Sequence, residues 1–280
     1  MLFCRMLREQ LYQLFRRKEF CISLAVMMIY CLGIFRFYCE QYQGYEINEV
    51  FPAYEAFAGN YNFYGFWGNL KIIFPILAVL PFADSYLVDR KTGERTLTLI
   101  RTTPGRYYWS KAFAVFLSAF LVFFIPLLTN FLLSFLAFPT DSVSHLGYDS
   151  FQGAYYLNLG YILFAPLFWY HPYLYNLLFV FHISAVCGLI ALFTYSLSFF
   201  IRNRLIILFL FFFLHLLNIY IEPFIDMLQS SQDFTFVAYI FAFADVREKN
   251  YVFYFVVLGV LVIGSVALIC WKSARRRDVL

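Results

Sequence analysis

Long apolar runs alternate with short polar stretches along this chain, and the pattern predicts helices that span a membrane. A spanning α-helix needs about 20 mostly apolar residues. Runs that are long enough occur at 20–37, 70–88, 112–138, 174–201, 205–221 and 251–271. A seventh stretch, 154–170, is nearly as apolar, but Pro166 and the following His171-Pro172 pair favour a broken helix. We therefore expect six spans, with 154–170 as a re-entrant or interfacial segment and seven spans as the alternative.

Basic residues decide between six and seven spans. With six spans and a cytosolic N-terminus, 17 of the 21 Lys and Arg residues lie in or beside cytosolic segments. The exceptions are Arg36, Lys71, Arg247 and Lys249. This asymmetry follows the positive-inside rule, so we expect both termini in the cytosol. The net charge of +4 reflects this topology, and we do not expect nucleic-acid binding.

Composition agrees with a membrane protein and excludes other classes. Hydrophobic residues make up 62% of the 280 residues and charged residues 14%, against about 25% charged residues in soluble domains. This balance excludes a soluble enzyme, a disordered protein and a disulfide-rich secreted domain. Of the six cysteines, only Cys39 is expected outside, so no intrachain disulfide is expected. The first run lacks a signal cleavage site, so we expect it to remain as a membrane anchor. No Asn-x-Ser/Thr sequence occurs, which favours a bacterial origin and hence the inner membrane.

The N-terminal residues 1–18 have a helical pattern of their own. Phe3, Leu7, Leu11 and Leu14 fall on one face, and most of the charged residues fall on the other. This predicts a helix that lies in the inner interface of the membrane. A cytosolic extension of the first span is the alternative.

The cytosolic connection 89–111 is longer than a turn between two spans requires. Gly93 and the run Thr103-Pro104-Gly105 punctuate it, and a short helix with apolar residues is expected between them. A structured cytosolic element of this kind invites a partner that is itself cytosolic.

Polar residues inside the spans are costly in lipid and therefore mark candidate functional positions. They are Asn69, Lys71 and Asp84 in the second span, and His215, Asn218 and Glu222 in the fifth. The last three share one helix face, because they are spaced i, i+3 and i+7. We expect all six to line a polar path, with hydrogen bonding between helices as the alternative. Proline predicts kinks at positions 75, 81 and 126.

Motifs for catalysis are absent from the sequence. There is no P-loop for nucleotide, no His-Glu-x-x-His or Cys-x-x-Cys for a metal, and no nucleophile motif. We therefore expect no enzyme activity, no metal and no cofactor bound by this chain.

One stretch resembles a known family. Residues 81–114, PFADSYLVDRKTGERTLTLIRTTPGRYYWSKAFA, are similar to the second-span exit and coupling loop of type-2 ATP-binding-cassette (ABC) permeases. The residues 196–208, SLSFFIRNRLIIL, resemble the family's junction between spans four and five. The chain departs from the family in the pair Glu94-Arg95, inserted between Gly93 and Thr96, and in a long aromatic segment before span four.

The resemblance implies a type V exporter-like fold: an all-α polytopic membrane protein with six transmembrane helices, an N-terminal interfacial helix, a cytosolic coupling helix, and outer re-entrant or interfacial helices in 139–173 and 222–250. Two such subunits, identical or different, would form one pathway in the lipid bilayer, chiefly along spans two and five. Separate ABC ATPase subunits would bind ATP and Mg²⁺. Residues implied in ATPase coupling are Asp89, Gly93, Glu94, Arg95, Leu97, Leu99, Ile100, Arg101, Thr103 and Pro104.

The expected function is thus that of an exporter permease for peptides, drug-like or lipid-like amphiphiles. Two alternatives stay open. One is a non-transporting immunity or scaffold protein of the membrane, and the other is a stand-alone secondary transporter or channel.

Overall fold

The computed structural model describes residues 2–59, 70–140, 163–227, 232–234, 236–241 and 248–274. The candidate residue Asn69 and the part 141–162 of the predicted outer segment lie outside this set. The backbones of Lys71 and Glu222 lie in described helices, and their side chains are outside the described set.

Among the described residues, five helices are long and apolar enough to cross a membrane. They are α2 (Lys18–Gln41), α6 (Pro104–Ala137), α9 (Pro172–Leu197), α10 (Arg204–Met227) and α11 (Tyr251–Ala274). They coincide with the first, third, fourth, fifth and sixth predicted runs. The chain is therefore a polytopic α-helical membrane protein.

The second predicted run is not one continuous helix. It consists of α3 (Leu70–Val79), a turn, and α4 (Ser85–Thr92). Pro81 stands in the turn, where it lacks an N–H and its ring would collide with a preceding carbonyl of a continued helix. The kink predicted at this proline is thus a break, whereas Pro75 lies inside α3 and Pro126 inside α6.

Shorter elements complete the described chain. They are α1 (Leu2–Phe15), η1 (Ile47–Glu49), α5 (Glu94–Arg101), α8 (Ala165–Tyr170) and η4 (Phe236–Tyr239), with the two-residue parallel pair β1 (Gln232–Asp233) and β2 (Glu248–Lys249). In that pair Gln232 is opposite Glu248, and Asp233 is opposite Lys249. The described part of the predicted re-entrant segment 154–170 is the short helix α8, which packs against α9.

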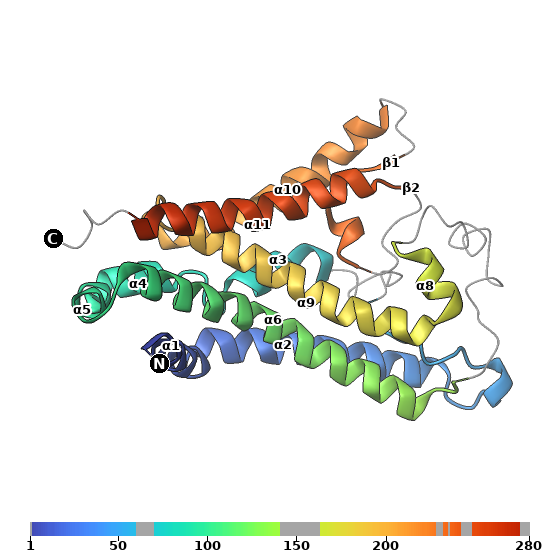
Figure 1. Ribbon diagram of the computed structural model, residues 1–280. Coiled ribbons are helices and arrows are strands. Elements are labelled where there is room, and N and C mark those ends of the chain that lie inside the picture. Colours follow the sequence, from blue (N-terminus) through green and yellow to red (C-terminus); the bar gives the residue numbers. More distant parts are fainter. Residues whose placement is uncertain are drawn as a thin grey trace.

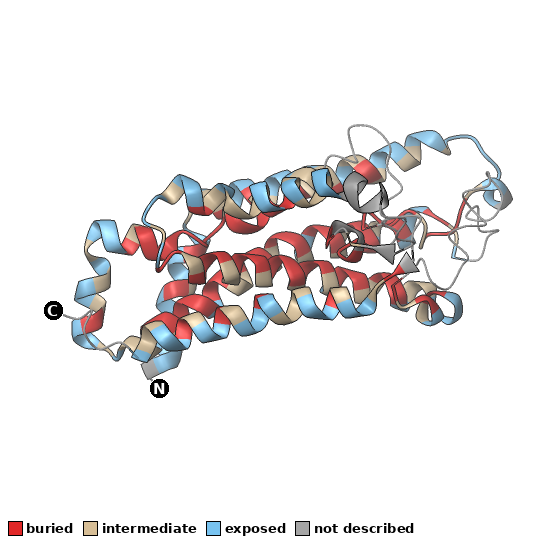
Figure 2. Cartoon of the chain, turned by 90° about the horizontal axis from the view of Figure 1, so that it is seen from above, coloured by how far each residue is buried: buried red, intermediate tan, exposed pale blue. Residues whose placement is uncertain are grey.

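Helices α6 and α9 form the centre of the bundle. Half of the residues in their apolar windows are buried (50% and 56%), against 11% in α10. Buried positions gather along the middle of the bundle in Figure 2. Gly188 of α9 allows the two helices to approach closely, because a Cβ there would lie 2.7 Å from Phe116 Cε2 and 3.1 Å from the Phe116 carbonyl oxygen.

The elements at the two ends of the bundle come from different parts of the sequence. Helices α1, α4 and α5 lie at the same end as the C-terminus, and α8, β1 and β2 lie at the other (Figure 1). We call the first the basic end, because it also carries Arg17, Lys111 and Arg204. The segments predicted to be cytosolic are thus together at one end of the molecule.

Candidate functional site

The most distinctive feature of the basic end is the elbow formed by α4 and α5. Gly93 ends α4 with φ of +79°, a left-handed conformation that side chains other than glycine rarely adopt. Its carbonyl accepts hydrogen bonds from the N–H groups of Thr96 and Leu97, which starts α5. Helix α5 then runs across the end of the bundle (Figure 1), so the short helix predicted between Gly93 and Thr103 is confirmed. Pro104 occupies the first turn of α6, where its missing N–H costs nothing.

A buried ion pair fixes the elbow to α6. The fully buried Lys111 pairs with Asp89 of α4, and its Nζ also donates to the Ser85 carbonyl at 3.4 Å. The hydroxyl of Tyr107 donates to Asp89 Oδ2 at 2.6 Å. The partners of the Asp89 carboxylate, Lys111 and Tyr107, are thus both residues of α6. Any role of Asp89 in coupling is transmitted through this helix.

A second charged centre surrounds Asp84, whose side chain is fully buried at the break between α3 and α4. Arg17 Nη1 donates to Asp84 Oδ1 at 2.7 Å. Arg204 Nε lies 2.5 Å from Asp84 Oδ2, as an ion pair without hydrogen-bond geometry. Arg204 Nη2 also donates to Glu19 Oε1 at 3.1 Å. One carboxylate thus connects the α1–α2 junction, the broken helix and the start of α10.

These contacts favour, for Asp84, the alternative of contacts between helices over a role in lining a polar path. Asp84 is enclosed, and two arginines neutralise it. The sequence contained a signal for this arrangement, because an acidic residue next to a spanning segment needs a cation nearby. Arg17 and Arg204 entered the sequence analysis only as markers of topology.

The apolar residues of α5 do not share one face. Leu97 and Ile100 are 62% and 72% exposed, whereas Leu99 is 7% exposed and belongs to the hydrophobic core. Arg95 turns inward, with its guanidinium 5.4 Å from the centre of the Tyr86 ring. Arg101 is exposed. The surface that α5 offers to a partner is therefore Leu97, Ile100 and Arg101, and Leu99 is not part of it.

Helix α1 is a separate helix and not an extension of the first span. It is seen end-on in Figure 1, whereas α2 lies in the plane, and Arg17 between them has an extended backbone. Its buried face is Met6, Gln10 and Leu14, which packs against α6. Phe3 is exposed at the protein surface, together with Tyr12 and Phe15.

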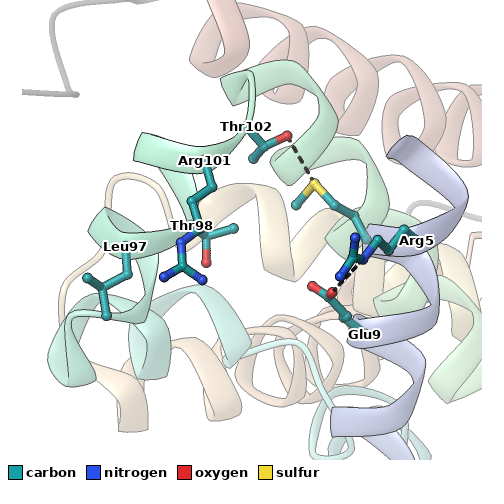
Figure 3. Close-up of a pocket in the computed structure, with 7 residues that line it drawn as sticks. Arg5, Glu9, Leu97, Thr98, Arg101 and Thr102 are labelled. Atoms are coloured by element: carbon teal, nitrogen blue, oxygen red, sulfur yellow. Dashed lines mark hydrogen bonds and ion pairs between the residues drawn. The ribbon is translucent and has the colours of Figure 1, made fainter. Parts of the chain in front are cut away.

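A groove of ≈ 340 Å³ separates α1 from α5. Figure 3 shows Thr98 and Arg101 of α5 facing Arg5 and Glu9 of α1 across this space. Its other lining residues are Met6, Leu97 and Thr102. The Thr102 hydroxyl donates to Met6 Sδ at 3.2 Å and holds the two helices together at the back of the groove.

The predicted polar stripe of α10 makes internal contacts. His215 is buried, and its ring meets the Phe74 ring edge-on with centroids 5.1 Å apart. Asn218 Nδ2 donates to the Phe234 carbonyl at 3.3 Å, and Asn218 Oδ1 accepts from the Phe236 N–H at 2.9 Å. These contacts favour the alternative of structural hydrogen bonding for Asn218.

Sequence reasoning missed His182, which lies inside α9. Its Nε2 is 2.8 Å from the Tyr239 carbonyl, and its Nδ1 is 3.3 Å from the Tyr254 hydroxyl. The Tyr239 carbonyl can only accept, so His182 Nε2 carries the proton in the neutral ring. His182 Nδ1 then accepts from the Tyr254 hydroxyl. A histidine in the middle of an apolar run was the signal that could have found it. Its contacts hold η4 against α9 and α11.

Comparison with family models, curated proteins and solved structures gives no match. In the described part of the chain, no three His, Cys, Asp or Glu side chains lie close enough to hold a metal ion. The class of protein is therefore defined by the helices alone: an α-helical membrane protein of several spans. Its candidate site is the α4–α5 elbow with the neighbouring groove.

Proposed function

We propose that this chain is the membrane permease subunit of a transporter that a separate ATP-hydrolysing subunit drives. The observation that carries the proposal is the elbow: an exposed helix, α5, whose base is held in the bundle by buried ion pairs. Apolar side chains such as Leu97 and Ile100 are unfavourable in water unless a partner covers them. The ATPase would bind this face, with Arg101 beside it.

The contacts of the elbow provide a route for transmitting force. Movement of α5 is passed to α6 through Asp89 and Lys111. It is passed to α2 and α10 through Asp84, Arg17 and Arg204. ATP bound in the partner can drive such movement only if the partner binds two conformations of the elbow with different affinity.

The rest of the proposal follows the family resemblance. Two such subunits, identical or different, would enclose a path for an amphiphilic substrate across a bacterial inner membrane. ATP and Mg²⁺ would bind in the partner subunits, because this chain has no P-loop. Both termini would be cytosolic, in agreement with the charge distribution of the sequence.

A non-transporting scaffold or immunity protein is the second candidate, and a specific observation favours it. Two residues expected to line a path, Asp84 and Asn218, are occupied by internal partners. Such internal pairing of Asp84 and Asn218 is what a protein without a transport path would need. Such a protein could still use the elbow to bind a cytosolic partner.

The test is purification of the tagged full chain from its native membranes in mild detergent, followed by measurement of ATP hydrolysis in the eluate. In the double variant Leu97→Asp/Ile100→Asp, the co-purifying ATP hydrolysis should fall about tenfold or more, because each aspartate would be buried against the partner. The matched control is Ile47→Asp. Ile47 is 74% exposed and belongs to η1, outside the basic end.

Equal hydrolysis in wild type and in the double variant would contradict the docking site. Hydrolysis that co-purifies without substrate transport in reconstituted vesicles would favour the scaffold over the permease. Loss of activity in Ile47→Asp as well would show a general defect and would also count against a specific docking face.

A further inference from the structure

We infer that the groove between α1 and α5 binds the phosphate of an anionic phospholipid headgroup. The groove has cationic side chains on both walls, Arg5 from α1 and Arg101 from α5. A guanidinium presents two parallel N–H donors, which match two oxygens of a phosphate. A lipid phosphate between the two walls would therefore be held from both sides (Figure 3).

The arginines of the groove are available to a ligand. Within the residues that the structure describes, Arg101 makes no ion pair or side-chain hydrogen bond. Arg5 has a partner, Glu9, but the pair is 3.7 Å long and both side chains are largely exposed. Water and salt weaken such a surface pair, so a doubly held phosphate can replace Glu9 as the partner of Arg5.

Hydroxyl groups add donors at the back of the groove. The Thr102 hydroxyl uses its proton on the Met6 sulfur, which is a weak acceptor. Rotation of that hydroxyl towards a phosphate oxygen would exchange this bond for a stronger, charge-assisted one. An anion in the groove would therefore give Thr102 a stronger acceptor, at the cost of its weak bond to Met6 Sδ.

The surroundings of the groove favour a lipid over a soluble anion. Helix α1 exposes Phe3, Tyr12 and Phe15 between its arginines, which is the pattern of a helix lying at the boundary of headgroups and acyl chains. Its last residue is followed within three positions by α2, a membrane-spanning helix. A second hollow continues from the groove along α1, and it is lined by Arg5, Arg8, Glu9, Tyr12 and Gln13. Acyl chains of a bound lipid could leave over the exposed aromatic rings.

The groove and the proposed ATPase contact share Leu97 and Arg101, but variants at other residues separate them. Ile100 is not among the residues that line the groove. Ile100→Asp should therefore reduce ATPase capture and leave lipid binding unchanged. Arg5→Gln alone, which leaves the exposed face of α5 intact, should weaken lipid binding and leave ATPase capture unchanged, so the two proposals can fail separately.

The experiment measures binding of phosphatidylglycerol to the purified full chain in neutral detergent, by native mass spectrometry, with phosphatidylcholine as the neutral lipid. Wild type should bind phosphatidylglycerol at least tenfold more tightly than phosphatidylcholine. Arg5→Gln/Arg101→Gln should lose most of that preference. The matched control, Arg90→Gln/Arg106→Gln, removes the same charge from exposed residues of the same end that do not line the groove, and it should keep the preference.

A second measurement needs no variant. Phosphatidylglycerol with a photoreactive headgroup should label peptides containing 2–9 and 97–102 of the unaltered protein. Labelling elsewhere at the basic end, or equal preference in the groove variant and wild type, would overturn the inference. Displacement of the lipid by inorganic phosphate at equal concentration would identify a soluble-anion site instead. Stronger displacement by a polyglutamate peptide would identify a docking site for an acidic protein segment.

Discussion

The two ends of the bundle are held together by different chemistry. At the basic end, buried carboxylates pair with cations: Asp84 with Arg17 and Arg204, and Asp89 with Lys111. At the opposite end, amides bind backbone groups and aromatic rings pack together. Comparing the two shows which end can rearrange without leaving polar groups unpaired.

The opposite end depends on directional bonds. Asn130 Oδ1 accepts from the Ala58 N–H at 2.8 Å, and its Nδ2 donates to the Cys31 carbonyl at 3.1 Å. Beside this contact, the Phe51 and Phe138 rings are stacked 5.1 Å apart. Each amide contact satisfies named backbone atoms, so a shift of one helix by an ångström or two breaks it.

At the basic end, a charged side chain can contact more than one side chain of opposite charge. Asp84 faces two arginines, and Arg204 faces both Asp84 and Glu19. Charge attraction falls off slowly with distance and depends little on angle. Helices at this end can therefore move and exchange partners while each charge stays neutralised. We therefore expect the centre around Asp84 to tolerate small helix shifts better than the amide contacts of the opposite end.

The largest expected effect is the loss of the buried cation at position 111. Lys111→Met leaves Asp89 buried without its charge partner and should destabilise the protein by about 3–5 kcal/mol. Unfolding in detergent by titration with a denaturing surfactant measures this change. Lys91→Met, an exposed lysine of α4, is the control and should change stability by less than about 0.5 kcal/mol.

The double variant Asp89→Asn/Lys111→Met restores neutrality and keeps an acceptor for Tyr107. It should therefore recover a large part of the loss. Equal stability of the single variant and wild type would show that the ion pair does not hold the elbow.

An intermediate effect is expected at the opposite end. Asn130→Leu leaves the Ala58 N–H buried without a partner and removes the second donor to the Cys31 carbonyl, which keeps its helical bond within α2, at a cost of about 1–3 kcal/mol. The same unfolding titration measures it, and Gln13→Leu, an exposed amide of α1, is the control. A loss larger than that of Lys111→Met would reverse the ranking of the two ends.

The smallest effect should follow removal of one shared partner. Glu19→Gln takes away a half-exposed contact of Arg204, but Arg204 keeps Asp84. Half-exposed pairs of this kind contribute about 0.2–1 kcal/mol. Unfolding titrations at low and at high salt should therefore differ little between this variant and wild type. A loss of several kcal/mol would mean that the charges at this end are not interchangeable.

The sequence predicted what depends on local pattern. Runs of apolar residues located five spanning helices, and Gly93 located the turn before α5. The break at Pro81 was foreseen only as a kink, because a proline inside an apolar run is compatible with both outcomes.

Side-chain contacts between residues that are far apart in the sequence could not be predicted. Arg17 and Asp84 are 67 residues apart in sequence, and no periodicity joins them. Leu99 is buried while Leu97 and Ile100 are exposed, because packing against the bundle decides which face of an eight-residue helix turns inward. Asn218 was placed on the correct helix, but its partners belong to a segment with no clear pattern. The positive-inside rule counts charges without showing which of them are paired.

The charged centre at Asp84 also has a consequence for the order of assembly. Glu19 and Arg204 are 185 residues apart, which is roughly 10–40 s of synthesis at about 5–20 residues per second. Glu19 lacks Arg204 throughout that interval, and once Asp84 has been made it has only Arg17 until residue 204 is added. A chain interrupted before residue 204 would carry an incompletely neutralised carboxylate at the membrane boundary. Quality-control proteases that sample unfinished membrane proteins would therefore encounter an open structure until the fifth span arrives, and arrival of α10 closes it.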